Sequence, residues 1–337
     1  MKVYRLDPIG NLDAIKMFDE PDPKPGPKQI VIRMRAASLN YRDYKVITGT
    51  YGHNETKDRL IPLSDGAGEV VELGEGVSRV KIGDRVMPIF GQRWLAGKIN
   101  PVYSTFSLGG QSDGVLAERI VLSEEGVVAI PSHLSFEEAA TLPCAAMTAW
   151  HALFSRGQLT AGQSVLTLGT GGVSLFAAQF AQLAGARVMM ISGSDSKIAR
   201  LKGMGIDSVV NYNTNPDWHR AILDLTQGQG VDHVVELGGP GTMEKSLRCL
   251  RMGGSLYMIG NLAGEAKIDP RLILAKRANV HGIQVGSREM FESMNQAITI
   301  AQLHPVIDRC FEFDKAREAY EYLAARKHFG KIVIRGT

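Results

Sequence analysis

The chain has 337 residues, of which 44% are hydrophobic and 22% are charged, and its formal net charge at pH 7 is +3. This length predicts two domains, and the small net charge gives no basis for binding nucleic acid. No apolar run approaches the ~20 residues of a membrane span, so we expect no membrane association. The N-terminus lacks a signal-like apolar region, and the three cysteines lie far apart, which favours a cytoplasmic protein with reduced thiols.

The first 126 residues have the pattern of a β-rich domain. Apolar runs at 29–37 and 68–73 predict strands, and Gly83-Asp84 between two apolar runs predicts a tight turn before a third strand. The polar and aromatic stretch 91–114 is expected to form a long loop. We expect this loop and the loop 51–60 to shape the substrate pocket.

From Ser135 onward the pattern changes to alternating helices and strands. Ser135 and Glu138 have the spacing of a capping box, and Pro143 begins a second helical pattern. Strands are predicted at 165–168, 187–192, 208–211, 231–237, 254–259 and 280–285, with helices at 175–183, 197–204, 216–227 and 241–251. This alternation is typical of a doubly wound parallel sheet, an α/β fold. The last segment, with a helix to residue 326 and a strand at 331–335, is expected to return to the first domain.

The turn between the first strand of that sheet and its helix is rich in glycine. It reads Gly169-Thr170-Gly171-Gly172-Val173. Gly169 permits a tight turn, and Gly171 lets the backbone approach a pyrophosphate beside the helix N-terminus. The third glycine position of this fingerprint holds Ser174, which is a departure. Strand, turn and helix in this order predict a dinucleotide-binding site.

The whole chain resembles the medium-chain dehydrogenase/reductase superfamily. The resemblance rests on IPLSDGAGEV at 61–70, VKIGDRV at 80–86, AATLP at 139–143, Thr148-Ala149, GTGGV at 169–173 and VGSR at 285–288. It implies a GroES-like β-rich catalytic domain at 1–126, a Rossmann domain at 127–286, and a return to the catalytic domain at 287–337. It also implies a small-molecule substrate and a homodimer paired through the last Rossmann strand.

The zinc-binding members of the superfamily hold a catalytic zinc through Cys, a His-Glu pair and a second Cys. The corresponding residues here are Asn40, Ser64-Asp65 and Cys144, so only one thiol remains. The stretch 91–112, where a structural zinc loop would lie, contains no cysteine. A catalytic zinc needs three strong donors. We therefore expect no metal, as in the quinone oxidoreductase-like branch.

In that branch the active-site loop carries Asn, Asp, Gly and Tyr in an order that is present here. The resemblance implies that Asn40 and Tyr51 line the nicotinamide and substrate pocket, and that Asp43 orders the loop. Turn chemistry and aromatic packing are the alternative explanations for these residues. Arg42 occupies the position of a proton-relay hydroxyl in the zinc enzymes.

The loop after the second Rossmann strand favours NADP over NAD. An acid at this position binds the ribose hydroxyls of NAD, whereas Ser192, Gly193 and Ser194 leave room for a 2′-phosphate. Lys197 is placed to pair with that phosphate, unless it is a solvated surface lysine. The resemblance adds Tyr212 and Arg326 to this pocket. Asp195 is the nearest acid and argues mildly for NAD.

Other cofactor contacts follow from the resemblance by position. Thr148 is expected near the nicotinamide, and the ends of two strands are expected to meet the ribose or nicotinamide through Gly238, Gly260 and Asn261. The loop of Gly286, Ser287 and Arg288 is expected to reach the carboxamide.

We therefore predict a zinc-independent, NADPH-dependent oxidoreductase that transfers hydride to a quinone or an α,β-unsaturated carbonyl. Without a Lewis acid, conjugated acceptors are favoured because their charge spreads onto a distant oxygen. Two alternatives stay open. One is a zinc-type alcohol or aldehyde dehydrogenase, and the other is a non-catalytic NADPH-binding protein.

Overall fold

The computed structural model describes residues 1–51, 56–104, 106–262 and 267–336. The chain forms two compact units, one of Met1–Met147 with Val285–Thr337 and one of Thr148–Gln284. The domain boundaries predicted from the sequence lie after residues 126 and 286. Residues 52–55, which belong to the predicted substrate loop 51–60, lie outside the described residues.

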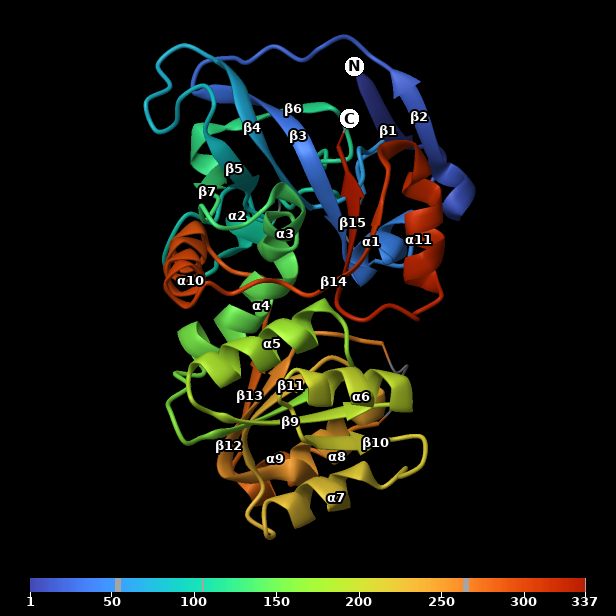
Figure 1. Ribbon diagram of the computed structural model, residues 1–337, viewed down its shortest axis with the longest axis vertical. Helices are drawn as coiled ribbons and strands as arrows, with labels where there is room; N and C mark the ends of the chain where they lie inside the picture. Colours follow the sequence, from blue (N-terminus) through green and yellow to red (C-terminus); the bar gives the residue numbers. More distant parts are fainter. Residues whose placement is uncertain (52–55, 105, 263–266, 337) are drawn as a thin grey trace. The chain divides into compact units, whose positions relative to one another are not determined.

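The first unit is built on strands from both ends of the chain, which pair in antiparallel except for the last two in the chain (Figure 1). Its strands are β1 (Lys2–Leu6), β2 (Ile15–Asp19), β3 (Gln29–Leu39), β4 (Asp65–Leu73), β5 (Arg85–Pro88), β6 (Arg119–Ser123), β7 (Val127–Ala129), β14 (Ile307–Phe311) and β15 (Lys331–Arg335). The main sheet runs in the order β14-β15-β3-β4-β5-β7, β6 also pairs with β3, and β1 and β2 form a separate pair. The end of the chain lies in this unit, where β15 pairs with β3.

The pairing of β3 with β15 joins residues that are almost 300 positions apart in the sequence. Ile332 lies opposite Leu39 and Ile334 lies opposite Ala37, in antiparallel register. Both isoleucines belong to the buried core of this unit, together with Ile30 and Ile32 of β3. Alternating apolar residues on these strands therefore anchor the last strand beside the end of β3, where the next loop begins.

The helices of the first unit range from 4 to 14 residues in length. They are α1 (Tyr41–Ile47), α2 (Pro101–Ser104), α3 (Phe136–Ala139), α10 (Arg288–Ala301) and α11 (Ala316–Ala324). The predicted capping box begins α3: Ser135 Oγ accepts from the Glu138 N–H at 3.1 Å, and Glu138 Oε2 accepts from the Ser135 N–H at 2.8 Å. The helical pattern at Pro143 forms a π-helical turn at Leu142–Ala146.

The second unit is the predicted doubly wound parallel sheet. Its strands are β8 (Ser164–Leu168), β9 (Arg187–Ser192), β10 (Ser208–Asn211), β11 (Val231–Glu236), β12 (Leu250–Met258) and β13 (Asn279–Gly282). They pair in the order β10-β9-β8-β11-β12-β13, all in parallel. This is the Rossmann order, in which the direction of the connections reverses between β8 and β11. The carboxyl ends of these two strands form the position where such sheets bind ligands.

Helices of the second unit precede and connect the parallel strands. They are α4 (Met147–Trp150), α5 (Gly172–Leu183), α6 (Asp195–Gly203), α7 (Trp218–Leu225), α8 (Pro240–Cys249) and α9 (Arg271–Lys276), and a π-helical segment spans His151–Arg156. Gly185 follows α5 with φ of +71°, which suits the end of a helix. Fully buried Leu166, Val234 and Leu256 from three neighbouring strands form part of the core.

The last parallel strand is shorter than predicted. β13 ends at Gly282, three residues before the predicted end, and Val285 has a φ of +30°. The chain leaves the sheet there because it must turn into α10, whose N-cap is Ser287. Among the described residues, no helix is long and apolar enough to cross a membrane.

Candidate active site

The glycine turn between β8 and α5 is open on one side. Gly169 has a φ of +77°, and its N–H donates to the Ile191 carbonyl at 2.8 Å. Gly171 is the N-cap of α5. Among the described residues, a Cβ added at either glycine would meet no heavy atom within 4 Å apart from its own chain neighbours. The first N–H groups of α5 have no partner within the helix and carry its positive dipole end, so this turn fits a pyrophosphate.

Ser174 shows why the third glycine of the fingerprint is dispensable here. Its side chain is buried, and its hydroxyl donates to the Leu168 carbonyl at 2.6 Å. This hydrogen bond ties the first turn of α5 to the end of β8. The close helix–strand packing that a glycine usually provides is therefore reached by a small residue with a hydroxyl group.

The loop after β9 is covered by an aromatic ring. Gly193 lies against Tyr212, since a Cβ at this glycine would stand 2.6 Å from Tyr212 Cζ. The Tyr212 N–H donates to the Ser192 carbonyl at 3.1 Å, and Ser192 is buried. Ser194 is the N-cap of α6. Lys197 lies in the first turn of α6. Of the six residues predicted for the 2′-phosphate, this region thus contains five: Ser192, Gly193, Ser194, Lys197 and Tyr212.

The one acid of this loop already has a partner. Asp195 Oδ1 accepts from Asn211 Nδ2 at 2.7 Å, which joins the start of α6 to the end of β10. A carboxylate held in this way acts as a link between two elements. The structure therefore gives Asp195 a role that does not depend on ribose binding.

A buried carboxylate that the sequence analysis did not single out holds the turn after β11. Glu236 Oε1 accepts from the N–H groups of Gly238 at 2.7 Å and Gly239 at 3.0 Å, and from the Thr242 hydroxyl at 2.6 Å; Ser246 donates to its other oxygen. Burial raises the pKa of Glu236, and these hydrogen bonds oppose the rise. The sequence feature that could have indicated this residue is an acid at the end of an otherwise apolar strand.

The turns after β11 and β12 pack on each other. A Cβ at Gly260 would lie 2.1 Å from the Leu237 carbonyl oxygen, and a Cβ at Gly239 would lie 2.8 Å from the Cα of Asn261. These glycines are therefore required by packing, whether or not a cofactor meets their backbone. Gly238 is crowded in the same way by Thr242. Thr148 is buried within α4.

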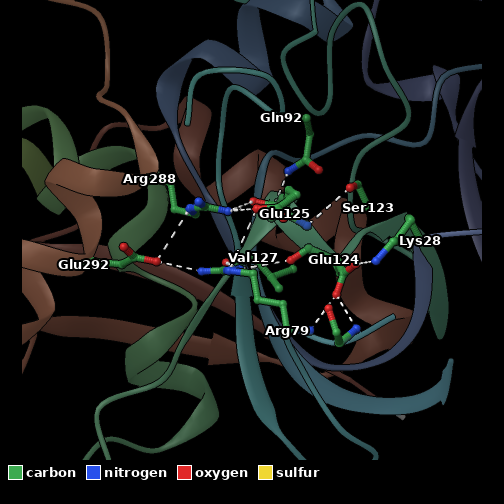
Figure 2. A network of polar contacts seen from close by, with 11 residues as sticks. Lys28, Arg79, Gln92, Ser123, Glu124, Glu125, Val127, Arg288 and Glu292 are labelled. Carbon is green, nitrogen blue, oxygen red and sulfur yellow. Dashed lines mark hydrogen bonds and ion pairs between the residues drawn. The ribbon is translucent and has the colours of Figure 1, made fainter. Parts of the chain in front are cut away.

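Arg288 of the first unit belongs to a network of charged side chains (Figure 2). Its guanidinium donates to the carbonyl and the carboxylate of Glu125 and lies 3.6 Å from Glu292, which also pairs with Arg79. The Arg288 N–H donates to the Trp94 carbonyl at 3.0 Å. The network fixes the start of α10, and the contact of the preceding loop with a carboxamide stays a prediction.

Two further predicted cofactor residues have contacts within the first unit. A Cβ at Gly286 would lie 2.8 Å from Met147 Cε, so this position is tightly packed. The Arg326 guanidinium lies over the Tyr41 ring, 4.9 Å from its centroid, and donates to the Tyr41 hydroxyl. Its contact with a 2′-phosphate stays a prediction.

Asn40 and Asp43 close the first turn of α1. Asp43 Oδ2 accepts from the Asn40 N–H at 2.8 Å, and the Asp43 N–H donates to the Asn40 carbonyl at 2.9 Å. Burial raises the pKa of Asp43 to about 6, against the opposing effect of Arg42. The loop-ordering geometry expected of Asp43 is thus present, and it holds Asn40 at the end of β3.

Arg42 connects this helix to the 107–110 loop and to Tyr51. Its guanidinium lies between the rings of Tyr51 and Phe90, 4.9 and 4.8 Å from their centroids. It donates to the Leu108 carbonyl at 3.1 Å and the Gly109 carbonyl at 3.2 Å. The ring of Tyr51, which is 37% exposed, is therefore positioned by a buried cation. The sequence by itself contained no indication that Arg42 contacts these two rings.

Lys331 is the second site residue that sequence reasoning missed. Its ammonium group is buried and donates to the Leu39 carbonyl and to Asn40 Oδ1, each at 2.7 Å. Burial lowers the pKa of Lys331, whereas the nearby Asp65 carboxylate raises it. Asp65 is fully buried and accepts from the Cys144 N–H at 3.0 Å and from the Ser64 hydroxyl at 2.7 Å. Burial raises the pKa of Asp65, and Lys331 opposes this.

This cluster does not fit a catalytic zinc. It offers one amide, one carboxylate and one thiol, and burial raises the pKa of the Cys144 thiol, which keeps it protonated. The Lys331 ammonium group would repel a divalent cation. Among the described residues, no group of three or more His, Cys, Asp or Glu side chains is arranged to hold a metal ion.

Comparisons with known proteins agree with this fold. A family model described as alcohol dehydrogenase GroES-like domain matches residues 26–132, and one described as zinc-binding dehydrogenase matches residues 172–299. The chain is 41% identical over 338 residues to a zinc-type alcohol dehydrogenase-like protein of Schizosaccharomyces pombe, covering 98% of this chain and 97% of that one.

Two relatives named for other activities are also similar to the chain. A 2-methylene-furan-3-one reductase of Solanum lycopersicum is 30% identical over 99% of this chain and 79% of its own length, and a quinone oxidoreductase of Pseudomonas aeruginosa is 28% identical over 96% of both. A crystal structure of an NAD-dependent alcohol dehydrogenase matches with a TM-score of 0.91 at 29% identity, covering 100% of both chains.

The chain belongs to the medium-chain dehydrogenase/reductase superfamily. Its fold is the GroES-like domain plus Rossmann domain that the sequence predicted, and it is an oxidoreductase of this superfamily.

Proposed function

We propose that the protein reduces a quinone or an α,β-unsaturated carbonyl with NADPH and without zinc. The observation that carries this proposal is the ammonium group of Lys331 among Asn40, Asp65 and Cys144. A site with these groups lacks the Lewis acid that a simple ketone or alkoxide needs. Conjugated acceptors depend on it less, because their negative charge spreads onto a remote oxygen.

The second unit supplies the residues that would hold the cofactor. The open turn of Gly169, Thr170, Gly171, Gly172 and Val173 would take the pyrophosphate, and Lys197 with Ser192 and Ser194 would take the 2′-phosphate. The neutral loop and the link between Asp195 and Asn211 support NADP over NAD. When bound, the nicotinamide supplies a hydride.

The first unit supplies the polar groups for the substrate. Asn40 would donate a hydrogen bond to the developing oxyanion, Asp43 would hold the loop, and Tyr51 or water would deliver the proton. Arg42 would keep the Tyr51 ring in place. The contacts that position these side chains, of Asp43 with Asn40 and of Arg42 with Tyr51, lie within the first unit.

The test is NADPH oxidation with a panel of quinones and enones, run beside metal analysis of protein purified without chelator. Turnover of either class by zinc-free protein supports the proposal. Turnover of alcohols by protein with stoichiometric zinc would replace it with the zinc-type alternative, to which the Schizosaccharomyces pombe relative and the NAD-dependent structure point. Tight NADPH binding without turnover of any substrate would favour a binding protein.

We also propose a cytoplasmic homodimer that pairs through β13. This strand lies at the edge of the parallel sheet, and Val280 on it is partly exposed. An edge strand presents backbone groups that a second copy can pair with. Molecular mass in solution, compared between wild type and a Val280→Pro variant, tests the interface, because proline removes a donor from the edge.

A further inference from the structure

The carboxamide of Asn40 has one satisfied end and one unsatisfied end. Its Oδ1 accepts a hydrogen bond from Lys331 Nζ at 2.7 Å. Its Nδ2 is buried and has no hydrogen-bond partner among the described residues. An interaction with this amide opposes the rise in the pKa of the nearby Asp65 carboxylate, but no contact of Nδ2 has the full geometry of a hydrogen bond. Buried donors without a partner are rare in proteins and need an explanation.

The contact with Lys331 determines which end of the Asn40 carboxamide is the oxygen and which is the nitrogen. An ammonium group has three donors and no acceptor, so the Asn40 atom at 2.7 Å must be the oxygen. The amide nitrogen is then the atom left over. A flip of the carboxamide would place two donors against each other at this contact, so the orientation depends on Lys331.

The position of Lys331 is itself strongly determined. It is the first residue of β15, its backbone is held by the pairing of β15 with β14, and its Nζ also donates to the Leu39 carbonyl at the end of β3. Asp65 at the start of β4 provides the opposite charge. Three strands of one sheet thus hold the ammonium group in a fixed place.

We propose that Lys331 is a positioning residue that fixes the Asn40 carboxamide with its nitrogen as the donor for the substrate oxygen. This rests on the proposed function, in which Asn40 stabilises the developing oxyanion. A donor that is already oriented needs no reorganisation during the reaction, and removing one such donor lowers kcat by about 10²–10³-fold in a known oxyanion hole.

The main variant is the double substitution Lys331→Met with Asp65→Asn, which removes both charges together and leaves no unpaired buried ion. We expect kcat to fall at least roughly tenfold, with unchanged KM for the acceptor and unchanged Kd for NADPH. Asn40→Asp keeps an acceptor for Lys331 and has no donor when its carboxyl group is ionised, so the folded variant should then lose roughly 10²-fold in kcat.

Ser38→Ala is the matched control. Ser38 Oγ donates to the Ile332 carbonyl at 3.1 Å, so this variant loses a buried hydrogen bond between the same two strands without touching Asn40. It should retain wild-type kcat. If the double variant is folded and binds NADPH normally but keeps wild-type kcat, the positioning role is wrong.

A spectroscopic measurement separates this inference from the proposed function. The Asn40 side-chain amide signal in a ¹⁵N-resolved spectrum is assigned by its loss in Asn40→Ser. We expect this signal to shift in the Lys331→Met, Asp65→Asn variant and to stay in place in Ser38→Ala. If wild type reduces neither quinones nor enones, the proposed function fails while this shift still supports the Lys331 contact. An unchanged signal overturns the inference.

Discussion

The ring of Tyr212 lies directly against the backbone of Gly193. A Cβ at residue 193 would stand 2.6 Å from Tyr212 Cζ and 2.7 Å from its hydroxyl oxygen. Real side chains do not approach so closely, so any larger residue at 193 must displace the ring. The loop after β9 and the residue after β10 are thereby coupled at the place where we propose the 2′-phosphate binds.

Gly193→Ala should therefore weaken NADPH binding through the displaced ring. Because Tyr212 is 41% exposed, it can move outward, and we expect little change in Tm. We expect the Kd for NADPH to rise roughly tenfold, measured by fluorescence titration. Gly203→Ala is the control, because a Cβ there meets no described heavy atom within 4 Å. Equal NADPH affinity in both variants would contradict the coupling.

Gly171→Ala should separate cofactor binding from folding. Gly171 has a φ of −80°, which alanine adopts without strain, and its added methyl group would point into open space. We expect an unchanged Tm and a loss of at least roughly tenfold in affinity for NADPH and NADH alike, because the methyl group occupies the pyrophosphate position. Retained affinity would mean that the cofactor does not approach this turn.

Lys197→Ala should change the preference between the two cofactors. A lysine in the first turn of α6 would pair with the 2′-phosphate of NADPH, which NADH lacks. We expect the Kd for NADPH to rise about tenfold, in line with the ~1.5 kcal/mol of a charge-assisted hydrogen bond, and the Kd for NADH to stay the same. Lys202→Ala in the last turn of the same helix is the control. A parallel loss of both cofactors would disprove the phosphate pairing.

Asp43 should make the stability of the first unit depend on pH. Its pKa is about 6 in the folded protein and 3.8 without burial, so the folded state keeps the proton that the unfolded state loses between these values. The contribution of Asp43 to the free energy of unfolding is fully present below pH 3.8 and is lost as the pH rises through about 6. The free energy of unfolding falls by at most about 3 kcal/mol over this range.

The comparison of wild type with Asp43→Asn isolates this effect. We expect the Tm of wild type to fall relative to the variant between pH 4.5 and about 6.5, and the difference to be constant above that range. Thermal melts at intervals of half a pH unit provide the measurement. A difference that is the same at every pH would show that Asp43 is ionised throughout, held by Arg42 at 3.2 Å.

Local patterns predicted most elements of the second unit, although β12 begins at Leu250, four residues before the predicted strand. The predicted strands at 187–192 and 208–211 agree with β9 and β10 residue for residue, because short apolar runs bounded by glycine and polar residues define strands without reference to distant parts of the chain. The prediction of β13 was wrong by three residues at its end. The last three residues of the predicted strand lie outside the sheet, on the way to α10. An apolar pattern does not indicate where the chain leaves a sheet.

Sequence alone determined the fold class and the glycine turn, since both follow from patterns of residues that lie close together in the chain. Only the tertiary structure revealed that Lys331 binds Asn40, which lies 291 residues earlier, and that Arg42 stands between Tyr51 and Phe90. These contacts arise from the pairing of β3 with β15 and from the packing of α1 on a distant loop. A lysine before an apolar strand looks like an exposed residue until burial is known, because burial is a property of the assembled sheet.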